Sequence, residues 1–598
     1  MKKNIIFLLL ISYSSNLFAQ KSKGPDGKAK TIFTKTVNFR ELSLQQKNKT
    51  ANKQILVTPE NAGGKEEDEG EELNEKIILK DEEKNIAPAA KNNFSKQAPQ
   101  SLSAVVNCKG FEGLNEIFTN TSPPDVSMAT GMDHLLMAIN AGILITNKNT
   151  GYVDSIINTT FWGGLGFTDF YDPKVLFDQL SGRWIMIIDA ERKSAISSIC
   201  IAVSQTYDPT GNWTIFYTDA DPSDVYWLDY PSIGFSNDKI VITGNMFTFT
   251  GTNASFTRTY VYNKIDLYNG TVAASTNYFD DATYFTLVPA TQFDNISNLY
   301  CVTQQDGPTG KLSRYTVSGS AASPTMSAAG TIDYPYAWGN ASGDILPQTG
   351  TAIKINAGGS RMLAYVVRNN IGYVAFTGGY PSGGPTSAGA TFGSFNNTSL
   401  AVIDLAAFYD PAGTWMTAYP NLIVTSDGTI VISCSYFSTT TYGSAAVGIW
   451  NTANGAYSNA SIYATKFGDD LYDRSFGGRN RWGDYSGICV DPSDDKTVWM
   501  ASEYAHVRDP GPAASRWGTW FSKYCGDCPA NLTVSNTLAN GNIKKYEVTN
   551  TITSTQNLSS GSYLKLDAAN AIIMSPGFRA QVGSILKAFI EGCGGADF

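Results

Sequence analysis

The chain has 598 residues, which is enough for more than one domain. Its 44 basic and 53 acidic residues give a net charge of −9, which argues against binding nucleic acids or anionic membranes, since both need a basic face. Only two histidines, His134 and His506, are present, so the composition also argues against most zinc sites and a Ser-His-Asp triad. With 12% aromatic and 16% charged residues, the composition is typical of an exported all-β protein.

The first 19 residues have the pattern of a secretory signal peptide. Lys2 and Lys3 form a positive end, residues 5–11 are apolar, and Ala19 ends a small-residue cleavage site. The apolar run is too short to span a bilayer, and no later stretch has about 18 uninterrupted apolar residues. The sequence therefore predicts an exported protein with no transmembrane segment, secreted or held at the cell surface.

Residues 20–101 have a different composition. They are rich in Lys, Asn, Gln and Glu, and residues 65–72 form a strongly acidic run. Such a segment has too little apolar surface to offset the entropy of ordering it. We predict a disordered linker or pro-segment here.

A repeated phrase organises residues 102–526. In its clearest copies, residues 229–245 and 484–500, an acidic residue and a tyrosine precede two short apolar strands separated by a polar turn, which is a β-hairpin pattern. Looser copies begin near residues 124, 172, 287, 362 and 419. Seven copies, spaced by roughly 50 to 75 residues, predict a seven-bladed β-propeller, whose blades have about 40 to 50 residues before insertions.

Two further features fit a closed ring. Residues 114–118 precede the first copy, and we expect them to supply an outer strand to the last blade, which removes an exposed edge. Residues 208–217 and 410–419 both place a Pro-containing turn before a tryptophan. We expect Trp213 and Trp415 to lie in the third or fourth strand of a blade, wedged between neighbouring blades.

Residues 527–598 contain short strands at even spacing, over residues 531–535, 545–548, 571–574 and 584–590. The line from Ile572 through Ser575-Pro576-Gly577-Phe578 to Ile590 resembles a small β-stack domain found at the carboxyl ends of exported proteins of certain Gram-negative bacteria. This resemblance implies a small C-terminal β domain, used for attachment or sorting, in an exported multidomain protein. It implies no activity.

Two segments within the repeats also resemble segments of a known family. Residues 353–361, which read Ile-Lys-Ile-Asn-Ala-Gly-Gly-Ser-Arg, and residues 481–486, which read Arg-Trp-Gly-Asp-Tyr-Ser, resemble a family of secreted bacterial propellers with no assigned reaction. The resemblance covers most of residues 120–525. It implies the seven-bladed fold and leaves the function open.

Export permits disulfides, and the chain has eight cysteines. Cys528 and Cys593 bracket the C-terminal domain, so we predict a disulfide between them, and Cys525 with Cys108 is a candidate second pair. The Cys525-Gly-Asp-Cys528 motif has no βαβ context for a redox site, which favours a structural role. The remaining four lie in apolar runs and are expected to be buried thiols: Cys200, Cys301, Cys434 and Cys489.

Four copies of the phrase begin near an aspartate, at Asp125, Asp172, Asp229 and Asp484. The innermost strands of a propeller surround its axis, so these acids are expected to form an oxygen-rich ring that suits Ca²⁺. The alternative is that each aspartate caps its own turn. Tyr230, Arg481 and Tyr485 lie beside these acids and complete the predicted binding site.

Arg474, Arg479 and Arg481 precede the last blade, and Glu503-Tyr504 follows. Such a set resembles sialidase-type propellers, because Arg binds carboxylates bidentately and some glycosidases use a Tyr nucleophile. However, only residues 426–429 approach the Asp-box repeat of that class, and stacking of Arg on blade aromatics is the alternative. The sequence thus favours a binding protein for a glycan or an extracellular protein, without a nucleic-acid partner. A glycan-active hydrolase or lyase is the alternative.

Overall fold

The computed structural model describes residues 22–51 and 100–592 apart from short gaps. The gaps fall at residues 102–109, 117–120, 149, 251–253, 272–274, 284, 306–308, 382–385, 452–458, 477, 509–514, 525–529, 541 and 591. The predicted signal peptide, over residues 1–19, lies outside the described residues. So do Cys108, Cys525, Cys528 and Cys593, and both predicted disulfides therefore stay predictions.

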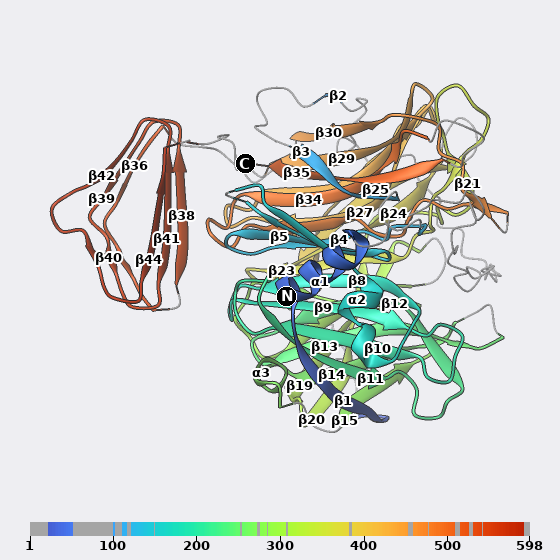
Figure 1. Cartoon of the computed structure of the whole chain (residues 1–598). Coiled ribbons are helices and arrows are strands. Elements are labelled where there is room, and N and C mark those ends of the chain that lie inside the picture. The colour runs from blue at the N-terminus through green and yellow to red at the C-terminus, as the bar shows by residue number, and fades with distance from the viewer. Residues whose placement is uncertain are drawn as a thin grey trace, which may run out of the picture.

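The described strands form an all-β propeller (Figure 1) with seven antiparallel four-stranded blades. Blades 1 and 2 are β4 (Ser127–Thr130), β5 (His134–Ile139), β6 (Gly142–Asn147), β7 (Val153–Ile157), and β8 (Phe170–Asp178), β9 (Arg183–Ala190), β10 (Ser198–Ser204), β11 (Asn212–Asp219). Blades 3 and 4 are β12 (Tyr226–Phe235), β13 (Lys239–Thr248), β14 (Ala254–Asn263), β15 (Ser275–Asp281), and β16 (Val288–Pro289), β18 (Leu299–Gln304), β19 (Lys311–Ser320), β20 (Ser323–Asp333). Blades 5 and 6 are β23 (Met362–Arg368), β24 (Ile371–Tyr380), β25 (Ser387–Asn396), β26 (Val402–Phe408), and β27 (Trp415–Val424), β28 (Ile430–Ser438), β29 (Thr441–Asn451), β30 (Asn459–Gly468).

Blade 7 closes the ring with a strand from the start of the repeats. It consists of β33 (Gly487–Val490), β34 (Val498–His506), β35 (Arg516–Tyr524) and β3 (Gly110–Asn115). β3 runs antiparallel to β35, with Gly110 opposite Ser522. The predicted closing strand is thus confirmed, although it begins four residues earlier than expected.

The remaining elements are short additions. They are β2 (Gln100–Ser101), β17 (Thr291–Gln292), β21 (Asp344–Leu346), β22 (Ile355–Asn356), β31 (Ser475–Phe476), β32 (Arg479–Asn480), α2 (Asn158–Phe161), the 3-10 turn η2 (Gly163–Leu165) and α3 (Lys264–Asn269). Trp213 and Trp415 are both buried, but Trp415 opens the innermost strand of blade 6. Its predicted place in a third or fourth strand is wrong.

The predicted disorder of residues 20–101 is wrong for residues 27–51. β1 (Gly27–Asn38) pairs with the outer strands β11 and β15, so it joins blades 2 and 3, and α1 (Phe39–Ala51) follows it. Ala29, Val37 and Phe39 are buried. These few apolar residues sufficed because the two open strand edges supply the backbone hydrogen bonds.

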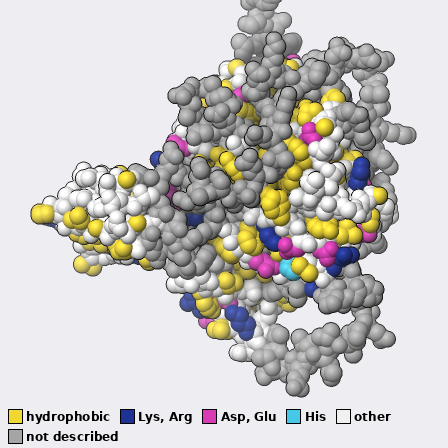
Figure 2. Space-filling view, turned by 90° about the horizontal axis from the view of Figure 1, so that it is seen from above, with side chains coloured by type: hydrophobic (Ala, Val, Ile, Leu, Met, Phe, Trp, Pro, Cys, Tyr) yellow, Lys and Arg dark blue, Asp and Glu magenta, His cyan; other side chains and the backbone are white. Residues whose placement is uncertain are grey.

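The C-terminal region is a small β domain, as predicted, with parallel strands wound into a three-coil solenoid (left in Figure 1). Its coils are β36 (Asn531–Val534), β37 (Thr537–Leu538), β38 (Ile543–Val548); β39 (Thr551–Ser554), β40 (Asn557–Leu558), β41 (Tyr563–Ala568); and β42 (Ala571–Met574), β43 (Arg579–Ala580), β44 (Ile585–Phe589). Ile552, Leu558 and Leu564 of the middle coil form its core. The solenoid surface seen in Figure 2 carries mainly uncharged side chains.

Two further observations concern membrane-spanning helices and the cysteine thiols. In the described part of the chain, no helix is long and apolar enough to cross a membrane. Cys200, Cys301 and Cys434 are buried free thiols, as predicted, whereas Cys489 is only partly buried.

Candidate functional site

A β-bulge shapes the inner strands of blades 2, 3 and 6 at the same point. Asp172, Tyr230 and Tyr419 occupy it with φ of 53°, 58° and 56°, and a proline follows each. Asp125 in blade 1 also has a positive φ of 48°. A non-glycine residue in this region costs about 1–3 kcal/mol, which marks it as a position held by its surroundings.

This geometry corrects the alignment of the predicted acids. Asp125 and Asp172 occupy the positive-φ position, whereas Asp229 lies one residue before it and Tyr230 takes its place. Asp484 likewise precedes a tyrosine, Tyr485. The prediction that the four acids share one point of the phrase is therefore wrong by one residue.

The four acids nevertheless gather at one end of the ring, where they are at most 6% exposed. Asp125 Oδ1 accepts the backbone N–H of Asp484 at 2.6 Å, and Asp125 Oδ2 accepts Asn140 Nδ2 at 2.6 Å. Asn140 Oδ1 in turn accepts the backbone N–H of Asp172 at 2.8 Å. Tyr485 donates to Asp172 Oδ2 at 2.9 Å. These bonds join blades 7, 1 and 2, so Asp125 and Asp172 do more than cap their own turns.

Three more charged residues, of which the sequence predicted only Glu503, join the four aspartates in what we call the axial acid cluster. They are Lys174 of β8, Asp189 of β9 and Glu503 of β34. Asp189 and Glu503 are at most 2% exposed. Asp189 directly follows the apolar run of residues 184–188, and a charge inside a buried strand was the sequence signal that could have found it.

Burial and mutual repulsion shift the proton affinities of the cluster. Burial, then repulsion by Asp172 and Asp484, raises the pKa of Asp125 to about 8. Burial, then Asp229, raises the pKa of Asp172 to about 7. Burial raises the pKa of Asp229 only to about 6, because Arg192 and Arg361 oppose it. Burial lowers the pKa of Lys174 to about 7, although the acids oppose this.

Several oxygens of the cluster have unused hydrogen-bonding capacity. Asp172 Oδ1, Asp229 Oδ1, Glu503 Oε1 and both oxygens of Asp189 are buried without a hydrogen-bond partner in the described structure. Such atoms are costly unless they are protonated or meet a ligand. Among the described residues, no group of three or more His, Cys, Asp or Glu side chains is placed to hold a metal ion. The calcium site at the four aspartates therefore stays a prediction.

The other predicted binding residues lie against this cluster. Arg481 Nη2 donates to Asp484 Oδ2 at 3.1 Å, and the Tyr230 and Tyr485 rings lie 4.8 Å apart. The guanidinium of Arg361 lies 4.5 Å from the Tyr230 ring centre. Arg361 and Arg481 are only partly buried, as is Lys174 of the same cluster.

The predicted sialidase-like set is only partly assembled. Arg474 pairs with Glu116, and Tyr504 donates to Glu112 at 3.3 Å, so these two side chains serve the outer part of blade 7. Arg479 lies in β32, paired with β31. Of the five residues, Arg481 and Glu503 interact with aspartates of the axial acid cluster.

An axial cavity of about 120 Å³ lies next to the acid cluster, although none of the acids of the cluster lines it. Inner strands of all seven blades line it, mostly with apolar side chains such as Val175, Phe235 and Leu422. Lys174 and Tyr485 line it as well and connect it to the acids. The site is thus a buried polar cluster beside a small axial cavity.

The fold and site define an all-β propeller with an axial acid cluster, and comparisons with known proteins add little. Neither a family model nor a curated protein matches the chain. Among solved structures, a Hadza microbial sialidase is 10% identical over 66% of this chain and 74% of its own, with a TM-score of 0.30. The α-L-arabinofuranosidase Arb93A from Fusarium graminearum is 14% identical over 57% and 89%, with a TM-score of 0.32. The WD40 domain of SCAP from fission yeast is 7% identical over 69% and 98%, with a TM-score of 0.31. Scores this low carry no argument about activity.

Proposed function

We propose that the protein is an exported glycan-active propeller, a hydrolase or lyase, that works at the axial acid cluster. The observation that carries this is a set of neighbouring carboxyl groups with pKa values spread from about 6 to about 8. Cleavage of a glycosidic bond needs one carboxyl group that gives a proton and another that is ionised. Environments that separate two such pKa values are the way proteins meet this need.

The roles follow from the pKa values. At pH 7, Asp125 with a pKa of about 8 is mostly protonated, so we assign it as the general acid. Asp229, with a pKa of about 6, is mostly ionised and is the candidate base or nucleophile. In this proposal Arg361 and Arg481 orient polar groups of the glycan beside the acids.

A second function is binding without turnover, of a glycan or an extracellular protein. The observation in its favour is that the four aspartates are at most 6% exposed. A partner that contacts only Arg361, Arg481 and their neighbours would not need to reach the acids.

A glycan array with the mature protein, followed by turnover assays on every hit, tests the proposal. We expect Asp125→Asn and Asp229→Asn each to lower turnover by about 10²–10⁴-fold, the usual contribution of general acid–base catalysis. Asp410→Asn is the matched control, because Asp410 lies in the connection between β26 and β27 and accepts the backbone N–H of Thr414. Binding without turnover would support the second function, and neither binding nor turnover would reject both.

A further inference from the structure

The solenoid rests on the seam between the first and last blades. Tyr563 donates to Asp133 Oδ1 at 2.7 Å, and Lys587 Nζ lies 3.0 Å from the same oxygen. Asp133 belongs to the β4–β5 turn of blade 1. On the other side, the backbone N–H of Lys545 donates to the carbonyl of Ser493 in the β33–β34 turn of blade 7. One domain therefore touches both sides of the closure.

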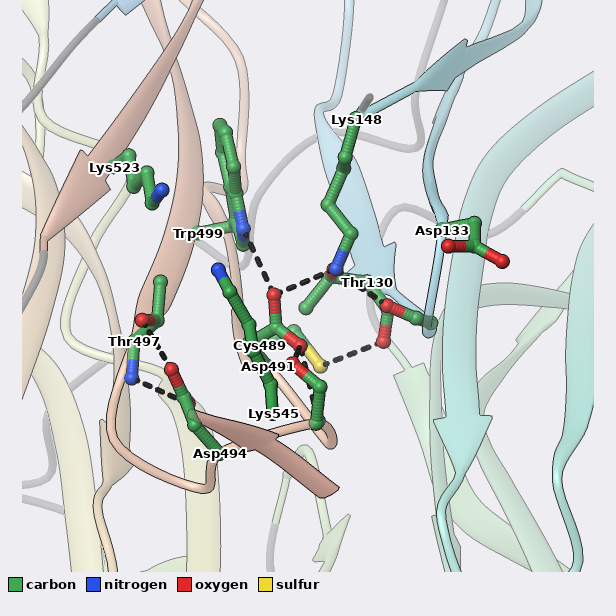
Figure 3. Close-up of polar contacts among 12 residues, drawn as sticks. Thr130, Asp133, Lys148, Cys489, Asp491, Asp494, Thr497, Trp499, Lys523 and Lys545 are labelled. Atoms are coloured by element: carbon green, nitrogen blue, oxygen red, sulfur yellow. Dashed lines mark hydrogen bonds and ion pairs between the residues drawn. The ribbon is translucent and has the colours of Figure 1, made fainter. Parts of the chain in front are cut away.

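A buried ion pair crosses the seam next to Lys545 of the solenoid (Figure 3). Lys148 of blade 1 lies 2.6 Å from Asp491 of blade 7, and the two side chains are 4% and 2% exposed. Lys148 Nζ also donates to Thr130 Oγ1 at 3.2 Å, and Trp499 Nε1 donates to Asp491 Oδ2 at 3.3 Å. A buried pair is favourable only when its remaining hydrogen-bonding groups are satisfied, as these are.

The solenoid contacts and the ion pair belong to one network. The Lys148 backbone N–H donates to the Asp133 carbonyl at 2.7 Å, so Asp133 holds the solenoid by its side chain and Lys148 by its main chain. Ser493 Oγ donates to Asp491 Oδ1 at 2.5 Å, so the turn that receives Lys545 also fixes Asp491. Lys545 is itself buried and pairs with Glu547 at 2.8 Å.

The inner strand β33 connects this network to the axial acid cluster. Asp491 directly follows β33, and Asp484 and Tyr485 precede β33. Only six residues therefore separate Asp484 of the acid cluster from Asp491 of the seam network. The seam is tightly packed along this strand, since a Cβ on Gly487 would lie 2.5 Å from Met128 of blade 1. A shift of Asp491 along the seam would therefore move Tyr485, which donates to Asp172.

We propose that the C-terminal solenoid is a clamp on the ring seam, which holds blades 1 and 7 together and thereby fixes Asp484 and Tyr485. The clamp itself is independent of the proposed function. Its effect on catalysis rests on that function. This role differs from attachment or sorting, because it acts on the propeller of the same chain.

The test uses the full mature chain with the double change Tyr563→Phe and Lys587→Met, which removes both side-chain bonds to Asp133 and keeps most of the apolar contact. The matched control is Tyr546→Phe with Lys544→Met, the same changes in the first coil, where neither side chain bonds to the propeller among the described residues. Substituting Lys148 is avoided, because an unpaired buried Asp491 would destabilise the whole ring.

Amide hydrogen exchange is read by mass spectrometry in peptides covering residues 484–506 and 124–140, with residues 226–248 of blade 3 as the internal reference. We expect exchange at the seam to become at least about tenfold faster in the clamp variant, with blade 3 unchanged, because local opening is reported by exchange. The control variant should match the wild type. Unchanged seam exchange, or an equal rise in blade 3, would overturn the clamp. No glycan is needed, so this outcome is separate from the proposed function.

Discussion

Asp125 shows how one side chain at the axis ties stability to pH. An unfolded aspartate has a pKa of about 3.9, whereas burial and the neighbouring acids raise the pKa of Asp125 to about 8. The folded chain therefore binds this proton more tightly. Its stabilising effect is complete below pH 4 and is lost as the pH rises towards 8.

We therefore expect the free energy of unfolding to fall by a few kcal/mol between pH 5 and pH 8, since a tenfold change in proton affinity is worth about 1.4 kcal/mol. Asp125→Asn should flatten this slope, as measured by denaturant titrations at several pH values. Asp410→Asn is the control of opposite sign: burial acts to raise the pKa of Asp410, but hydrogen bonds from Thr414 and from backbone N–H groups together outweigh it and hold the pKa below its ordinary value. A slope that survives Asp125→Asn would contradict the assignment.

The same residues carry the calcium prediction. Crowded carboxylates either hold protons or take up a cation, and weak extracellular Ca²⁺ sites have Kd around 10⁻⁴–10⁻³ M. At about 100 times Kd, bound Ca²⁺ would stabilise the fold by roughly 2.7 kcal/mol. Asp229→Asn and Asp484→Asn should each reduce this effect in thermal melts. Superimposable melts with calcium and with chelator would reject the site.

At the scale of single elements, β1 shows that part of the N-terminal segment packs on the propeller. Phe39 is fully buried at the start of α1, directly after β1, whereas Phe33 of β1 is 52% exposed. We expect Phe39→Ala to cost about 3–5 kcal/mol in denaturant unfolding, the usual cost of truncating a buried aromatic. Phe33→Ala should stay within about 0.5 kcal/mol. Equal effects would mean that β1 does not dock on the propeller in solution.

The solenoid carries the second prediction at this scale. A disulfide between Cys528 and Cys593 would close a long loop around the three coils and contribute on the order of 4 kcal/mol in the chain-entropy model. Peptide mapping of exported protein without reductant should recover the two cysteines in one cross-linked peptide pair. Either one found as a free thiol would refute the pairing.

For the whole molecule, the sequence was most informative where the pattern is local. Hairpin phrases predicted the seven blades, and strand spacing predicted a β domain at the end of the chain. The parallel winding of that domain was not predicted, because strand patterns alone do not specify which strands pair. Docking of residues 27–51 was missed for a similar reason: its partners, β11 and β15, lie far away in the sequence.

The axial site was likewise predicted only in part. Asp125, Asp172, Asp229 and Asp484 were predicted to meet because ring closure brings equivalent positions together. Their one-residue offset was not, since it depends on bulges that only the folded backbone shows. Lys174 of β8 and Asp189 of β9 also belong to the site, but they were not predicted because the search used only the acids that open each copy of the repeated phrase.

At the scale of the whole molecule, we predict that ring closure by β3 stabilises the fold. Leu114 of β3 is 5% exposed and packs in a core cluster that contains Met128 of blade 1 and Trp517 of blade 7. Leu114→Ala removes apolar contact from both sides of the closure, so we expect a loss of about 2–5 kcal/mol in denaturant unfolding. Leu180→Ala is the matched control, because Leu180 lies in a turn of blade 2 and is 44% exposed, and it should stay within about 0.5 kcal/mol. If the two variants unfold at the same denaturant concentration, β3 does not close the ring, and the edge of β35 must be protected in another way.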